Sequence, residues 1–170
     1  MSQLLLPSVK RHKVFALASA LIVGSSLSIS LSAQTAPPAP SPSKQAIEVR
    51  KAAFTLIANN FKPVGDVLKG TTLFDAAEVQ KRTSRVAFLS QLLSETFPDA
   101  SNVGLPDTKA KAEIWTDRAN FDKRLKEFQE HATALAQVAA KESSASDAFK
   151  SAATAVAQDC KGCHDSFKAK

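Results

Sequence analysis

Methionine, tyrosine, histidine and cysteine are scarce or absent in this chain of 170 residues. Met1 is the only methionine, tyrosine is absent, and there are three histidines and two cysteines. The alternation of apolar and polar residues that is typical of β-strands is also missing. Lys and Arg form no cluster with interleaved aromatic residues, so nucleic-acid binding is not expected. The chain offers helical periodicity and few side chains able to bind a metal.

The first 33 residues have the composition of a secretory signal peptide. Lys10, Arg11 and Lys13 precede an apolar run from Val14 to Val23, and a Ser-rich stretch ends at Ala33. The run is about half of the ~20 residues that a membrane-spanning helix needs, so no membrane anchor is expected. We therefore predict cleavage near Ala33 and a periplasmic protein, with an uncleaved N-terminal helix as the alternative.

Cleavage there would leave enough chain for one domain with one core. The remainder has 19 basic and 16 acidic side chains, a formal charge of +3, because the leader holds three of the 22 Lys and Arg and no acid. Residues 34–43 are rich in Pro and Ser and are expected to be a flexible segment. Residues 44–170 are expected to form the folded domain.

Apolar residues in the predicted domain recur at helical spacing, which favours four helices. We expect the first over about 44–61, ended or kinked by Pro63, and the second over about 75–96. Residues 98–116 should form a long crossing loop. Thr116 is expected to cap the third helix, and the fourth should start near Ser144 or Ser146. The predicted fold is all-α, an antiparallel four-helix bundle.

Each predicted helix carries an apolar stripe that should face the bundle core. The stripes are Ile47, Phe54, Ile57 and Phe61; Val79, Val86 and Leu93; Phe121, Leu125, Phe128, Ala132 and Leu135; and Phe149, Ala152, Val156, Cys160, Cys163 and Phe167. The first helix has a second apolar strip of Val49, Ala53 and Leu56, which a lone bundle would leave exposed. A homodimer through the first two helices would bury that strip.

Both cysteines and one histidine lie within five residues near the C-terminus. Cys160 and Cys163 are three apart, and His164 follows at once, so a helix would place all three on one face. C-x-x-C-H is the attachment signature of c-type haem, in which two thiols join the porphyrin and the imidazole binds the iron. We predict one covalently attached haem c near the C-terminus, with His164 as its axial ligand.

Three other readings of the motif are weaker. A redox Cys-x-x-Cys pair would start a helix after a strand, and no strand is expected. A structural zinc site usually needs four N or S ligands, but the mature chain offers two Cys and two His. A structural disulfide would join distant elements, whereas this loop is only four residues long.

The sixth iron ligand is the next question. With no methionine after the leader, thioether ligation is excluded. His131 lies off the apolar stripe of its helix and should face solvent. A lysine ligand would need a neutral amine in an apolar core, which costs several pKa units. We expect a five-coordinate iron.

With this motif and bundle, residues 44–170 resemble cytochrome c′. VRKAAFTLIANNF supplies Arg50 and Phe54, EIWTD supplies Trp115, and CKGCHDSFK supplies the haem site. The resemblance implies that Arg50 pairs with a haem propionate, that Phe54 covers the open face of the iron and that Trp115 lies at the haem edge. The alternatives are a surface salt bridge for Arg50, an ordinary core role for Phe54 and a plug at the bundle end for Trp115.

The sequence departs from the family pattern after the motif. The family often has Tyr and then Arg where this chain has Phe167 and Lys168. Lys168, four residues after His164, can still place a positive charge in the proximal pocket, but it lacks the planar fork of Arg.

The expected function is binding of nitric oxide first and carbon monoxide second at a high-spin haem c. A distal Phe has no hydrogen-bond donor to stabilise dioxygen. The resemblance implies NO scavenging or defence against nitrosative stress. Two other functions stay open: electron transfer with a periplasmic redox partner, which the mild basicity would suit, and a weak peroxidase activity, for which no distal His/Arg pair is apparent.

Overall fold

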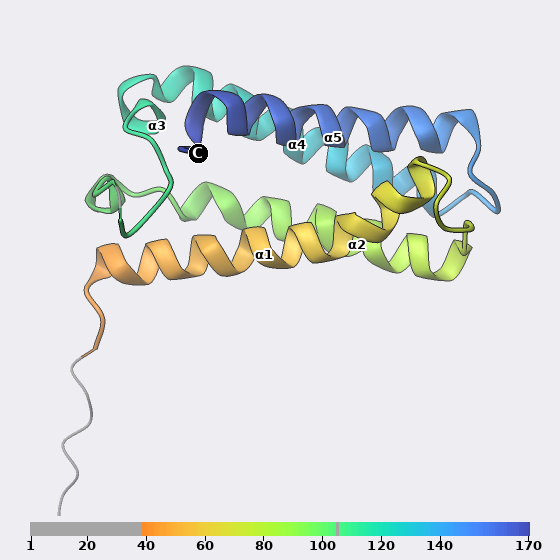
Figure 1. Cartoon of the computed structure of the whole chain (residues 1–170), viewed down its shortest axis with the longest axis horizontal. Helices are drawn as coiled ribbons and strands as arrows, with labels where there is room; N and C mark the ends of the chain where they lie inside the picture. The colour runs from red at the N-terminus through yellow and green to blue at the C-terminus, as the bar shows by residue number, and fades with distance from the viewer. Residues whose placement is uncertain (1–38, 105) are drawn as a thin grey trace, which may run out of the picture. The chain divides into compact units, whose positions relative to one another are not determined.

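Helices make up the regular structure of residues 39–104 and 106–170, the part of the chain that this computed structural model describes (Figure 1). The elements are α1 (Pro42–Leu68), α2 (Ala76–Gln91), η1 (Leu92–Glu95), η2 (Asp99–Ser101), α3 (Glu113–Thr116), α4 (Arg118–Ala139) and α5 (Asp147–Phe167). The predicted leader, residues 1–33, lies outside the described residues. Within them, no helix is long and apolar enough to cross a membrane.

The first helix, α1, is longer than predicted at both ends. It begins at Pro42, where Ser41 accepts a hydrogen bond from the Lys44 amide, and it runs through Pro63 to Leu68. Of the two effects predicted for Pro63, an end or a kink, the end of the helix was therefore wrong. Val64 and Val67, in the turn after the proline, are buried in the core. We attribute the continuation to this burial, which offsets the hydrogen bond that a proline cannot donate.

The second predicted helix is divided in two. Its α-helical part, α2, ends at Gln91, and the 3₁₀ turn η1 carries the chain on to Glu95. The predicted stripe of Val79, Val86 and Leu93 is buried along its whole length.

The crossing connection contains one helical turn that the sequence pattern did not reveal. This turn, α3, ends at Thr116, so the prediction that Thr116 caps the next helix was wrong. The N-cap of α4 is Asp117, whose carbonyl accepts from the Phe121 amide. Buried Ile114 holds α3 against the bundle, and this tertiary contact fixes a turn too short to be stable alone.

The last helix, α5, begins as predicted after Ser146, whose hydroxyl accepts from the Phe149 amide at 3.2 Å. Phe149, Val156 and Phe167 are buried. Ala152 is only half-buried, and its neighbour Ala153 takes the core position instead. The cysteines lie at the edge of the core, half-buried, toward the end of this helix.

The helices form the predicted antiparallel four-helix bundle, with α1 and α2 in one layer and α4 and α5 in the other (Figure 1). Contacts are dense between α1 and α2, between α2 and α4, and between α4 and α5. By comparison, α1 and α5 touch sparsely. The bundle is thus less closely packed where α1 faces α5, the helix that carries the cysteines.

Candidate haem site

The C-x-x-C-H motif occupies the last two turns of α5. No disulfide joins the two cysteines. Burial raises the pKa of the Cys160 thiol to about 11 and also raises the pKa of Cys163. Both thiols therefore stay protonated at neutral pH, unlike the activated thiols of redox Cys-x-x-Cys pairs. Across the described residues, no three His, Cys, Asp or Glu side chains come close enough to hold a metal ion, which leaves the zinc reading without support.

His164 follows on the same helix and is exposed at the surface. Its pKa is lowered, first by partial burial and then by the positive charge of Lys168, while Asp165 acts in the opposite direction. A lowered pKa keeps the imidazole neutral near pH 7, and the neutral ring is the form that binds a metal.

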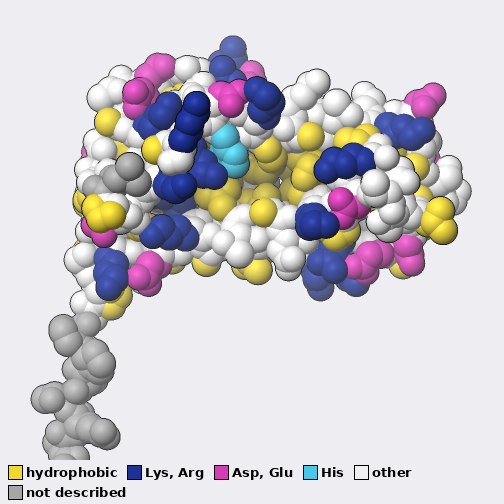
Figure 2. All heavy atoms as spheres, viewed as in Figure 1, with side chains coloured by type: hydrophobic (Ala, Val, Ile, Leu, Met, Phe, Trp, Pro, Cys, Tyr) yellow, Lys and Arg dark blue, Asp and Glu magenta, His cyan; other side chains and the backbone are white. Residues whose placement is uncertain are grey.

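Aromatic side chains of α1 face the same region. Phe54 and Phe61 are seven residues apart, so they lie on one flank of the helix. Asn60 lies on the opposite flank of α1. Its side-chain oxygen accepts a hydrogen bond at 3.4 Å from Arg82 of α2, so that flank contacts α2. Phe54 and Phe61 therefore lie on the flank away from α2, toward α5. The space-filling view shows a hollow with a hydrophobic floor beside a histidine, with lysine and arginine side chains around it (Figure 2).

Phe54 is half-buried and belongs to an aromatic cluster at this end of the bundle. Its ring meets that of Phe97 at 6.5 Å between centroids, in an edge-to-face arrangement. Phe97 is itself buried against Phe121, at 4.7 Å. One side of the Phe54 ring is thus supported by the core, and part of the ring stays open.

Arg50 is buried, with only 3% of its surface exposed, so the surface salt-bridge alternative was wrong. Its guanidinium donates to the Thr96 carbonyl, the Ser101 hydroxyl and the Thr108 hydroxyl at 3.1, 3.3 and 2.9 Å. It also lies 4.6 Å from the centre of the Phe97 ring. All three acceptors are neutral, and burial lowers the pKa of Arg50. A buried cation without a carboxylate nearby is costly, so an anionic group close to it would be stabilising.

The other two predicted site residues lie near this end of the bundle. Trp115, in α3, donates from its indole N–H to the Pro98 carbonyl at 3.3 Å and packs near Phe97. Lys168 is exposed just after α5 and lines a groove beside His164. Arg50, Phe54 and Trp115 therefore share one aromatic cluster around Phe97, whereas Lys168 lies apart from it.

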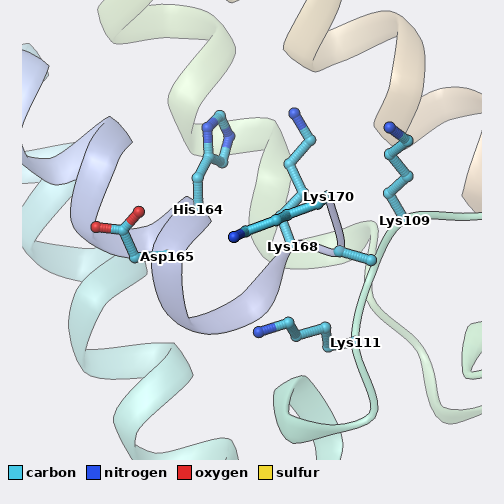
Figure 3. A pocket seen from close by; sticks show the side chains of 7 residues that line it. Lys109, Lys111, His164, Asp165, Lys168 and Lys170 are labelled. Carbon is cyan, nitrogen blue, oxygen red and sulfur yellow. The ribbon is translucent and has the colours of Figure 1, made fainter.

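The groove at His164 has a volume of about 520 Å³ and carries four lysines that the sequence analysis did not group (Figure 3). Backbone pairing brings them together: the Lys111 amide donates to the Phe167 carbonyl at 3.0 Å, and the Ala169 amide donates to the Lys109 carbonyl at 2.8 Å. No sequence pattern could have revealed this, because the two segments are more than fifty residues apart. We call Lys109, Lys111, Lys168 and Lys170 the lysine collar.

Two more residues near the motif were not singled out as site residues. Arg124 of α4 points at the cysteine segment, and a Cβ atom added to Gly162 would lie 3.0 Å from its Nη1. The Arg124 Nε is buried with no hydrogen-bond partner. His131, 47% exposed as expected, pairs through Nδ1 with Asp159 at 2.7 Å, which holds it on the outer surface. Both contacts depend on the register between α4 and α5, which the sequence does not give.

These features fit a covalently attached haem. Two thiols and an imidazole lie on one helix, beside an apolar hollow at the loosest seam of the bundle. A buried cation that lacks a carboxylate partner lies on α1. One imidazole and a neighbouring apolar hollow suit a haem iron that would be held by a single histidine.

Comparison with known proteins gives a consistent result. Residues 45–168 match the family model described as Cytochrome C'. A cytochrome c' from Rhodopseudomonas palustris is 37% identical over 124 residues, which are 73% of this chain and 82% of the relative. A solved structure of cytochrome c prime from Shewanella frigidimarina is 45% identical with a TM-score of 0.71, covering 78% of this chain and 100% of that one.

A further similar structure holds a gas. It is a nitric oxide complex of a variant of cytochrome c prime from Alcaligenes xylosoxidans, 29% identical with a TM-score of 0.69, and it covers 78% of this chain and 99% of that one.

Proposed function

Because this chain belongs to the cytochrome c′ family and carries covalently attached haem c, we propose that it binds the small gases nitric oxide and carbon monoxide. When bound, the haem supplies an iron with one coordination position free for a diatomic ligand. The observation that carries the proposal is the pairing of the C-x-x-C-H motif on α5 with the flank of α1 that carries the aromatic side chains Phe54 and Phe61. The nitric oxide complex of the Alcaligenes relative supports it.

The attachment roles follow from the motif. Cys160 and Cys163 form the two thioethers, and their positions three residues apart on α5 place both sulfurs on the side of the helix that borders the core. His164 binds the iron with its neutral imidazole, which its lowered pKa favours. Arg50 is the propionate partner, because it is a buried cation with only neutral acceptors. Trp115 borders the haem edge from the same aromatic cluster.

Phe54 covers the gas-binding face and sets its selectivity. Its ring offers no hydrogen-bond donor, and dioxygen depends on such a donor far more than nitric oxide or carbon monoxide do. The half-buried ring restricts access by bulk. The site should therefore favour nitric oxide over dioxygen.

Lys168 lies near His164 and not near Phe54. Its positive charge contributes to the lowered pKa of the His164 imidazole. A lysine there cannot form the two parallel hydrogen bonds of an arginine. The physiological role that best fits these properties is nitric oxide scavenging or defence against nitrosative stress in the periplasm, after removal of residues 1–33.

An optical spectrum of the purified protein tests this function directly. A five-coordinate iron gives high-spin bands in both ferric and ferrous forms, and the ferrous protein should bind carbon monoxide and nitric oxide. A sharp low-spin ferrous α-band with no response to either gas would instead assign the protein to electron transfer alone.

The face made by α1 and α2 supports assembly into a homodimer. Val49 and Leu56 on α1 are 50% and 49% exposed, Phe88 on α2 is 67% exposed, and Leu92, at the start of η1, is 41% exposed. Ala53, expected in this strip, is instead buried in the core. Because α1 and α2 pack side by side and η1 continues α2, these four exposed side chains lie on one layer of the bundle, and a second copy would cover them.

A further inference from the structure

The lysine collar differs in its charge pairing from the lysines along the helix surfaces that pair with an acid. Elsewhere, helix-surface lysines commonly pair with an acid one turn away, as Lys62 does with Asp66 at 2.7 Å. Even Asp165, the one acid lining the collar groove, is bonded to Lys161. In the described part of the chain, no ion pair involves any of the four collar lysines. The collar therefore gathers four lysine charges beside a single lining acid, Asp165, which is itself bonded to Lys161.

The collar is also held in place by the backbone. Ala110 and Lys168 form an antiparallel bridge, and the Lys111 ammonium donates to the Ser166 carbonyl at 3.2 Å. These contacts fix the segment before α3 against the chain end after α5. The four lysines thus line one groove with His164 from two segments, and Figure 3 shows Lys168 and Lys170 nearest the imidazole, with Lys109 and Lys111 farther from it.

From this geometry we propose that the lysine collar docks an acidic one-electron carrier protein, which reduces the haem. The proposal rests on the proposed function, because gas binding as described uses ferrous iron and that iron needs an electron donor. One electron passes from the reduced partner to the ferric haem, and the partner is left oxidised by one electron. Carboxylates on the partner match the unpaired ammonium groups, and the collar brings them next to the helix that holds the haem.

The test compares two triple variants of the full holoprotein with equal changes in charge. One carries Lys109→Gln, Lys111→Gln and Lys170→Gln; Lys168 is kept because it adjoins His164. The matched control replaces Lys69, Lys141 and Lys150 by Gln. Lys69 caps the end of α1, Lys141 follows α4 and Lys150 lies in the first turn of α5, so all three are at the other end of the bundle.

The first measurement is the fluorescence anisotropy of a labelled deca-glutamate peptide at low salt. We expect the wild type to bind the peptide and the collar variant to bind it about tenfold more weakly, because the variant loses three exposed charge pairs that each contribute modestly. The control variant should bind like the wild type. Binding should weaken as salt is raised, because exposed charges are screened.

The second measurement ties the collar to the haem. The ferrous protein gives one electron to ferricyanide, an anion, or to tris(phenanthroline)cobalt(III), a cation. In the collar variant the reaction with ferricyanide should slow by several-fold and the reaction with the cobalt complex should accelerate, because a probe near the collar meets less positive charge. The control should change both rates far less.

Three results would overturn the proposal. The first is that the wild type fails to bind the peptide. The second is that both triple variants weaken binding equally, which would assign the effect to net charge. The third is that the collar variant shifts the haem spectrum, which would assign these lysines to the haem propionates. Carbon monoxide binding by the wild type is measured separately, so a failure of gas binding is distinguishable from a failure of docking.

Discussion

Replacing Phe54 by Ala should open the gas-binding face of the haem. The Phe54 ring rests against Phe97, which is buried against Phe121 and lies under the Arg50 guanidinium. This support keeps the ring from moving toward the core when a ligand enters. We therefore expect the wild-type ring to oppose ligand binding sterically by about 1–3 kcal/mol, which is roughly ten- to hundredfold in carbon monoxide affinity.

The assay is an equilibrium titration of the ferrous protein with carbon monoxide, with flash photolysis to give the rebinding rate. Phe54→Ala should bind carbon monoxide faster and more tightly than the wild type. Phe54→His should go further and convert the spectrum to low-spin, because an imidazole at this position would bind the iron directly.

Phe61→Ala is the matched control, because it makes the same change on the same flank of α1, two helical turns further along. It should leave carbon monoxide binding close to wild type. If Phe61→Ala raises the affinity and Phe54→Ala does not, Phe61 is the lid. If neither variant alters the kinetics or the ferric spectrum, both side chains are ordinary core and the reasoning about this flank is refuted.

Three other changes test the attachment, the dimer and the first helix. Covalent attachment predicts that the denatured protein keeps its haem through acid–acetone extraction, and that Cys160→Ala lowers the yield of haem-containing protein; complete extraction of haem from the wild type would contradict it. Phe88→Glu, like Val49→Glu, should shift light scattering toward monomer without altering the haem spectrum, since it places a charge on the apolar face of α1 and α2; a wild type that is monomeric at high micromolar concentration would disprove the interface. Pro63→Ala should stabilise the protein by about 1–3 kcal/mol in thermal unfolding, because it restores a helical hydrogen bond inside α1; an unchanged or lower unfolding temperature would mean that the bundle depends on the proline.

The helical architecture could be predicted because it depends on local periodicity. The predicted stripes of α2 and α4 are buried as expected, and Ser146 caps α5 where its side chain implied. The errors fall where tertiary packing outweighs a local preference. Pro63 stays helical because Val64 and Val67 after it are buried, and α3 exists because Ile114 is anchored in the core.

The sequence by itself determined the cofactor, because C-x-x-C-H places its three reactive groups on one face of any helix that contains it, whatever surrounds that helix. The resemblance of VRKAAFTLIANNF to the family also singled out Arg50 as the partner of a haem propionate. Only the tertiary structure decided that Arg50 is buried among Thr96, Ser101 and Thr108, since those acceptors are 46 to 58 residues away along the chain. The lysine collar likewise appears only when the segment before α3 pairs with the chain end, because charge that is dispersed in sequence becomes a surface feature only through long-range backbone contacts.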